Sequence, residues 1–397
     1  MHGSRIVRRV FSLLAAYATL LPLAAYADIE ITLKNSFIEK FKNRVTIDAG
    51  FTVDKAHKRP NPANKDGDLH AAGRAPEIGL PAVAEVMNAR FQQPALDLIH
   101  QSEQTAQPVQ LRGVWRLWCE HGGDISFKQG DALQPFTTTN PDHVFEVHPL
   151  LKVGGQNLAD SLEPIDGFTY KDAEQAFRFY ENLKSHITPG ASTTTITTTM
   201  AGFNYVEFAI QLNEDPTHAV DDGLTVRAAI LNLDGELLVR ERRMVFAAGT
   251  QPFERVKDLH KGDTLHVVGV PRIDLALVSF RASHRDRPGI LDWSLPYEMV
   301  IVAAFDDTPQ PEDEAAHAAA PAVPEGIAAP EAAAAPAPSE ANVIESLTRM
   351  LGERPETNEG SGACEFRAGA RTFCVVSTKE ECAQIGGRWH AGKTCQP

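Results

Sequence analysis

The sequence lacks the short motifs that mark the best-known enzyme classes. It has no Gly-x-Ser-x-Gly, no Walker phosphate loop, no dinucleotide-binding fingerprint and no His-Glu-x-x-His. Positive charge is also scarce, with 38 Lys and Arg against 52 Asp and Glu and a net charge of −14. Non-specific nucleic-acid binding needs a basic surface that releases counterions, so this balance argues against a general nucleic-acid binder. A basic patch on one domain would still be compatible with the total.

Long apolar runs are absent after the N-terminus. Residues 1–27 contain Arg5, Arg8 and Arg9, then an apolar run, then the small-x-small triplet that ends at Ala27. This layout predicts a signal peptide cleaved after Ala27, because the apolar run is short for a membrane span. We therefore expect an exported protein, periplasmic or extracellular, with no later transmembrane segment.

Cysteine is rare and unevenly placed. Of five cysteines, one is Cys119 and four lie in the last 34 residues. We expect Cys119 to be a small buried apolar residue. In an oxidising compartment the clustered four predict two disulfides of undetermined connectivity, and spacing without Cys-x-x-Cys pairs disfavours zinc. The four are Cys364, Cys374, Cys382 and Cys395.

Short β-branched and aromatic segments separated by Gly, Pro and Asn predict a mainly β protein. We expect two small barrel- or sandwich-like (OB-like) domains, at 28–165 and 191–305, the second including a strand at 273–282. A helix at 169–187, capped by Thr169, is expected to connect them, since apolar residues recur there at helical spacing.

The composition changes after the second β region. Residues 306–340 are rich in Ala, Pro and acid and predict a disordered linker, followed by a short helix at 341–353. The final segment, 361–397, is too small to fold without its disulfides. Its pattern, from Gly362-Ala363-Cys364 to Gly386-Gly387-Arg388-Trp389 and Cys395, resembles a four-cysteine module of secreted bacterial proteins. That resemblance implies an accessory module without catalytic activity.

A second resemblance lies within residues 45–153. The segments DGDLH (66–70) and FEVHPL (145–150) resemble paired Asp-Gly-Asp-x-His and aromatic/Ile-Glu-Ile/Leu-His-Pro motifs. The pair occurs in mostly uncharacterised exported bacterial proteins, loosely similar to OB-like or thermonuclease-like barrels. A complete nuclease motif set is absent, so no catalytic residue is carried over.

These motifs supply the candidate site. Glu146 and His148 lie two residues apart on a predicted strand and so share a face, and the DGDLH turn is expected to pack beside them. The cluster could tie the fold together, bind a divalent metal or perform acid/base chemistry, or recognise a ligand; of these we favour the structural role. No metal or other cofactor is required by the sequence. The candidates are Asp66, Asp68, His70, Glu146 and His148, whereas His143 is expected to be exposed and incidental.

Two arginine-bearing strands are further candidates. Arg112 and Arg116 alternate with Val114 and Trp118, which predicts a half-buried strand with arginines reaching solvent. Arg240 and Arg242 share a face and form a weak candidate anion patch, although a charged edge strand is the default explanation.

We therefore predict an exported, non-catalytic binding or structural envelope protein whose ligand or envelope partner and oligomeric state are undefined. The alternative is a metal-assisted phosphodiesterase or nuclease that uses Asp68, His70, Glu146 and His148.

Overall fold

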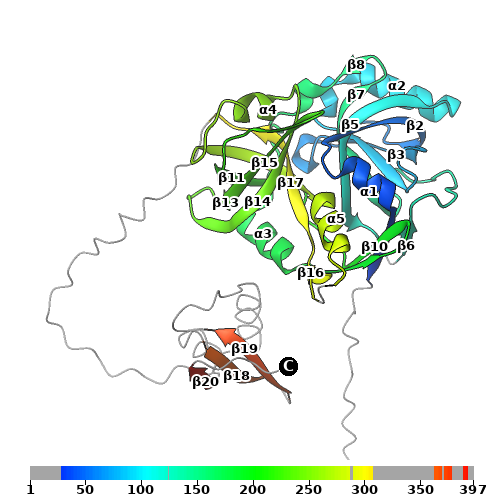
Figure 1. The fold of residues 1–397 in the computed structure, drawn as a ribbon. Helices are drawn as coiled ribbons and strands as arrows, with labels where there is room; N and C mark the ends of the chain where they lie inside the picture. Colours follow the sequence, from blue (N-terminus) through cyan, green and yellow to red (C-terminus); the bar gives the residue numbers. More distant parts are fainter. Residues whose placement is uncertain are drawn as a thin grey trace, which may run out of the picture.

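The computed structural model describes residues 28–123, 125–286 and 289–306, together with the backbone of three short strands near the C-terminus (Figure 1). Those strands pair antiparallel in the order β19-β18-β20: β18 (Gly362–Ala368), β19 (Arg371–Ser377) and β20 (Arg388–Ala391). The predicted signal peptide, linker, helix at 341–353 and disulfides lie outside the residues or side chains described. No described helix has the length and apolar character needed to cross a membrane.

The first barrel closes through five strands in the order β2-β3-β4-β7-β5-β2. Its β4–β7 pair is parallel and its other pairs are antiparallel, and helix α2 lies between β4 and β5 in the chain. This is the Greek-key order of an OB-like barrel. The elements are β2 (Thr46–Ala56), β3 (Leu69–Arg74), β4 (Ala82–Val86), α2 (Gln93–Thr105), β5 (Val109–His121) and β7 (His143–Val153), with β8 (Gln156–Asn157) extending β7.

The second barrel repeats the same order, β11-β13-β14-β17-β15-β11, again with its third and fifth strands parallel. Gly235, at φ +87°, completes the turn that joins β13 to β14. The prediction of two OB-like β domains is therefore confirmed. The elements are β11 (Val206–Leu212), β12 (His218–Val220), β13 (Gly223–Leu231), β14 (Leu237–Ala247), α4 (Gln251–Val256), β15 (Thr264–Ile273) and β17 (Tyr297–Ala304).

A third sheet combines distant parts of the chain in the order β16-β9-β10-β1-β6. The segment 28–34, expected in the first barrel, pairs here instead, with Ile31 opposite Ile196. The strands are β1 (Ile29–Lys34), β6 (Ser126–Lys128), β9 (Lys184–Pro189), β10 (Thr193–Thr198) and β16 (Asp292–Ser294).

The connecting helix is shorter than predicted. Helix α3 (Ala173–Asn182) begins after Asp172, not Thr169, and the Asp172 carboxylate accepts a hydrogen bond from the Gln175 N–H at 2.8 Å. The predicted helical residues after 183 form β9, where Ser185 and Ile187 are buried and their neighbours are not. This alternation has the period of a strand, which the longer helical prediction overlooked.

The predicted strand at 273–282 is wrong. Strand β15 ends at Ile273, and the Asp274 carboxylate accepts hydrogen bonds from the N–H groups of Ala276 and Leu277. An aspartate in this position caps a helix, so the apolar run that follows is α5 (Leu275–Ser283). The remaining helices are α1 (Asn35–Phe41) and the short turns η1 (Ala63–Lys65), η2 (Ala89–Phe91) and η3 (Ala159–Ser161).

Candidate functional site

The two sequence motifs meet inside the first barrel. Asp68 directly precedes β3, and His148 lies on β7. The Asp68 Oδ2 and His148 Nε2 atoms are 3.6 Å apart, although 80 positions separate the residues in the sequence. Glu146 shares the side of the strand with His148, since its Oε2 lies 3.4 Å from His148 Nδ1.

Two further side chains complete this cluster, and neither was predicted. Glu85 on β4 places Oε2 at 3.3 Å from His148 Nδ1. The Tyr205 hydroxyl, just before β11 of the second barrel, donates to Asp68 Oδ2 at 2.6 Å and lies 2.8 Å from His148 Nε2. Tyr205 therefore joins the first barrel to the second. No local pattern around either residue marks it, because both contacts are made between segments distant in the chain.

The cluster is enclosed. Asp68 and His148 are fully buried, and Glu85 and Glu146 are 4% and 3% exposed. Burial raises the pKa of Asp68 well above its ordinary value, despite the opposing effect of His148. Burial alone would lower the pKa of His148, but three surrounding carboxylates raise it to about 9. The favoured state is thus a protonated His148 held among carboxyl groups, which compensates the buried charge internally.

Glu146 is kept ionised by a buried arginine. Burial would raise the pKa of Glu146, but the Arg116 guanidinium and the neighbouring histidines hold it well below its ordinary value. Arg116 contacts Glu146 through Nη1, Glu120 Oε2 through Nη2 at 3.0 Å, and the Pro271 carbonyl of the second barrel through Nε at 2.9 Å. It is fully buried, so the interpretation of Arg116 as an arginine that reaches solvent is wrong.

The other candidates of the DGDLH motif have separate roles. Asp66 Oδ1 accepts from the Asp68 N–H and from Asn61 Nδ2, both at 3.0 Å, and so closes the turn. His70 faces Glu85 across the β3–β4 pair, with His70 Nε2 at 3.6 Å from Glu85 Oε2, and its ring stacks on His57.

His143 was expected to be exposed, but it is buried, with only 1% of its surface accessible to solvent. Its Nδ1 lies 2.7 Å from the Pro141 carbonyl and its Nε2 lies 3.4 Å from Glu146 Oε1. The sequence pattern placed it before the strand, whereas β7 begins at this residue and turns it inward. Cys119, by contrast, is fully buried as expected, and burial raises the pKa of its thiol to about 12.

Replacing Tyr205 with phenylalanine should lower the free energy of unfolding by about 1–3 kcal/mol. The substitution leaves Asp68 Oδ2 and His148 Nε2 buried without their shared hydroxyl partner. Urea unfolding followed by circular dichroism measures the change. Tyr170→Phe is the matched control. It also removes a tyrosine hydroxyl, but that hydroxyl bonds only the nearby Ile165 N–H, so the loss should be smaller. A loss of less than about 0.5 kcal/mol in Tyr205→Phe, the size typical of ordinary surface substitutions, would contradict the bridging role.

An open groove lies on the second barrel, on the side of β13 and β14 and the connection between β15 and β17. In OB-like barrels this face, with the adjoining loops, is where ligands bind. The groove has a volume of about 700 Å³. Phe280 and Trp293 line it and are 47% and 41% exposed.

The charges along this groove are nearly balanced. Arg227 lies 2.6 Å from Glu241, Arg242 contacts Glu181, and Arg243 lies 3.7 Å from Asp274. Of the two arginines in the candidate anion patch, Arg242 has a carboxylate partner in Glu181, and Arg240 is exposed. The Arg281 guanidinium lies 5.8 Å from the centre of the Trp293 ring.

The strand order, the parallel pair and the helix between the third and fourth strands define a protein with two OB-like barrels. No protein-family model matches the sequence, and no curated protein sequence matches it. Among solved structures, the wild-type single-stranded DNA binding protein from Thermus aquaticus is similar over 68% of this chain and 94% of that chain. The identity is 10% and the TM-score 0.18. Because that score is so low, the OB-like assignment rests on the strand order alone.

Proposed function

We propose that this is an exported, non-catalytic binding protein that holds its ligand in the groove of the second barrel. The observation that carries the proposal is the position of this groove on the ligand face of an OB-like barrel, with two aromatic side chains exposed in it. Large exposed aromatic side chains in a concave surface are typical of binding sites. Export is supported by the N-terminal segment and by the cysteine-rich tail.

The Asp68–His148 cluster supports a structural role rather than catalysis. A substrate would have to reach Asp68, Glu146 and His148, which are at most 3% exposed. The Tyr205 hydroxyl covers Asp68 and His148 from the second barrel, and only His70 is partly exposed. A general acid or base must come within hydrogen-bond distance of the group it serves. The metal-assisted hydrolase at these residues is therefore the weaker hypothesis.

The groove favours a neutral, ring-containing ligand such as an oligosaccharide. Three of its four arginines have carboxylate partners, so it offers little excess positive charge to a polyanion. Paired arginines and carboxylates instead present many hydrogen-bond donors and acceptors beside the Trp293 and Phe280 rings. Oligosaccharides are among the ligands that OB-like barrels bind.

Binding measurements on the full chain test this proposal. A panel of neutral oligosaccharides, acidic oligosaccharides and an oligothymidylate would be titrated by calorimetry. We expect a neutral oligosaccharide to bind and Trp293→Ala to weaken that binding about 30-fold, as for an aromatic hot spot worth about 2 kcal/mol. The matched control is Phe91→Ala, which removes a 67% exposed ring outside the groove and should leave affinity unchanged.

Three results would contradict the proposal. Tighter binding of the oligothymidylate than of any oligosaccharide would contradict the proposed ligand class. An affinity of Trp293→Ala equal to that of the wild type would mean that the ligand binds outside the groove. Turnover of any panel member by the purified protein would overturn the non-catalytic assignment.

A further inference from the structure

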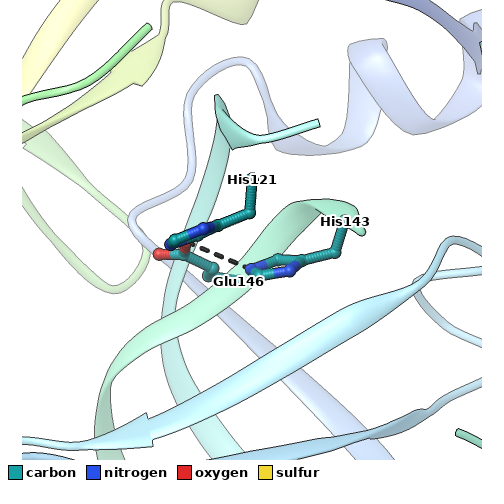
Figure 2. Close-up of side chains that lie close together, drawn as sticks. All are labelled: His121, His143 and Glu146. Atoms are coloured by element: carbon teal, nitrogen blue, oxygen red, sulfur yellow. Dashed lines mark ion pairs between the residues drawn. The ribbon is translucent and has the colours of Figure 1, made fainter. Parts of the chain in front are cut away.

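A second group of histidine and carboxylate side chains lies where β5 ends and β7 begins. His121 is the last residue of β5 and His143 the first of β7, and they are paired across the two strands. Their rings stack with centres 5.0 Å apart. Figure 2 shows Glu146 pointing toward both rings from further along β7. One ligand atom from each of the three side chains lies within 4.8 Å of the other two.

His143 is oriented so that one nitrogen faces the group without a hydrogen bond. A carbonyl oxygen can only accept, so the 2.7 Å contact with the Pro141 carbonyl requires the proton to be on Nδ1. Nε2 then points at Glu146 Oε1 at 3.4 Å, but the geometry makes no hydrogen bond. The side chain is 1% exposed, so water does not satisfy Nε2 from bulk solvent.

One oxygen of Glu146 also faces this group. Arg116 and His148 contact its Oε2, which leaves Oε1 facing His143. Arg116 is itself matched by a second carboxylate, that of Glu120. His143 Nε2 and Glu146 Oε1 therefore face each other across a buried gap of 3.4 Å, and Nε2 has no hydrogen-bond partner there. A shared cation satisfies both.

We propose that His121, His143 and Glu146 bind a divalent transition-metal ion of the zinc class. Two imidazoles and one carboxylate are an established zinc ligand set, with water as the fourth ligand. The carbonyl contact of His143 is the outer hydrogen bond that metal-binding histidines usually make. His121 is only half-buried, which provides a route from solvent.

The role of this ion is structural. It would join the two ends of the β5–β7 connection, residues 122–142, in which the described part includes β6. The site adjoins the Asp68–Glu85–His148 cluster through Glu146, whose Oε2 faces His148 while its Oε1 faces His143. In that cluster both His148 nitrogens already lie near Tyr205 and carboxylates. The metal site is independent of the groove proposed for ligand binding on the second barrel.

Cobalt titration of the full chain tests the site, because Co²⁺ reports its ligands by absorption. We expect one equivalent of Co²⁺ with visible bands of a four-coordinate nitrogen and oxygen site, displaced by Zn²⁺. His121→Ala should weaken binding at least about 100-fold, beyond the 10–100-fold cost of losing an outer partner. Zn²⁺ at 100 times its Kd should raise the Tm by about 5 °C in the wild type and not in the variant.

The matched control is His260→Ala, which removes an imidazole whose side chain is 79% exposed and lies outside the group. It should bind Co²⁺ like the wild type. Circular dichroism and metal-free Tm values close to those of the wild type would show that His121→Ala is folded. The proposal is overturned if the folded wild type binds no equivalent, which would mean that a proton bridges His143 and Glu146. It is also overturned if His121→Ala binds Co²⁺ with full affinity. Thiolate charge-transfer bands would show that the ion is bound by the tail cysteines and not by the His121 group, which would overturn the proposal as well.

Discussion

Replacing Arg116 with methionine should lower the free energy of unfolding by about 3–5 kcal/mol. The guanidinium is fully buried and contacts Glu146, Glu120 and the Pro271 carbonyl. Without it, the Glu146 carboxylate, which is 3% exposed, loses its strongest counter-charge and keeps only the neighbouring histidines, and the Pro271 carbonyl loses its donor. Urea unfolding of metal-free protein, followed by tryptophan fluorescence and circular dichroism, measures the loss.

Arg112→Met is the matched control for this substitution. Arg112 lies on the same strand, but its side chain is 46% exposed and lies 3.5 Å from Asp48, which is exposed. Surface pairs contribute about 0–1 kcal/mol, so this variant should differ little from the wild type. The double variant Arg116→Met/Glu146→Met should recover part of the loss, because it removes both buried charges. Equal stability of Arg116→Met and Arg112→Met would refute the role assigned to Arg116.

Much of the β architecture could be predicted because its strands are marked locally. Residues 193–198 are all β-branched, and Asn232 to Gly235 form a hairpin turn. Helix α5 was mistaken for a strand because a short apolar run fits either structure. The available sequence signal was Asp274, because aspartate commonly caps the start of a helix, as it does here. Helix α2 was not predicted, although Pro94 in its first turn is a common helix start.

The candidate site was only partly predictable for a different reason. Asp68 and His148 were recognisable because a turn motif and an alternating strand carry them. Glu85 and Tyr205 reach His148 through the barrel closure and through the contact between barrels, neither of which leaves a local pattern. The burial of Arg116 was missed for the same reason. An alternating strand has one solvent-exposed face only if no second domain covers that face, and here the second barrel covers it.

The two barrels are joined by arginines that point in opposite directions. Arg116 on β5 donates to the Pro271 carbonyl on β15 at 2.9 Å. The next residue, Arg272, donates back to the Trp115 carbonyl on β5 at 3.0 Å. Tyr205 adds a third connection through Asp68. Because these donors and acceptors are buried and specific in geometry, they fix how the barrels pack, which apolar contacts alone would do less precisely.

Replacing Arg272 with methionine should lower the free energy of unfolding by about 3 kcal/mol and uncouple the barrels. Arg272 is 1% exposed, pairs with Glu298 Oε1 at 2.7 Å, and lies 3.6 Å from the centre of the Trp115 ring. It also donates to backbone carbonyls of the first-barrel segment at Arg44 and Val45. We expect a smaller loss than for Arg116→Met, because Arg243 Nε remains 3.3 Å from Glu298 Oε2 and partly compensates its charge.

The shape of the unfolding curve separates coupling from general stability. Tryptophan fluorescence is weighted toward the first barrel, because Trp115 and Trp118 are buried on β5 whereas Trp293 beside the second barrel is 41% exposed. The wild type should unfold in one transition by fluorescence and by circular dichroism. In Arg272→Met the two probes should give different midpoints, because each barrel then unfolds separately. Arg272→Lys keeps the charge but not the planar set of donors, so its separation of midpoints should lie between those of the wild type and Arg272→Met. Arg227→Met, at a side chain 62% exposed on the second barrel, is the matched control and should unfold like the wild type. Coincident midpoints in Arg272→Met would mean that the barrels are held together by their apolar contacts and not by the reciprocal arginines.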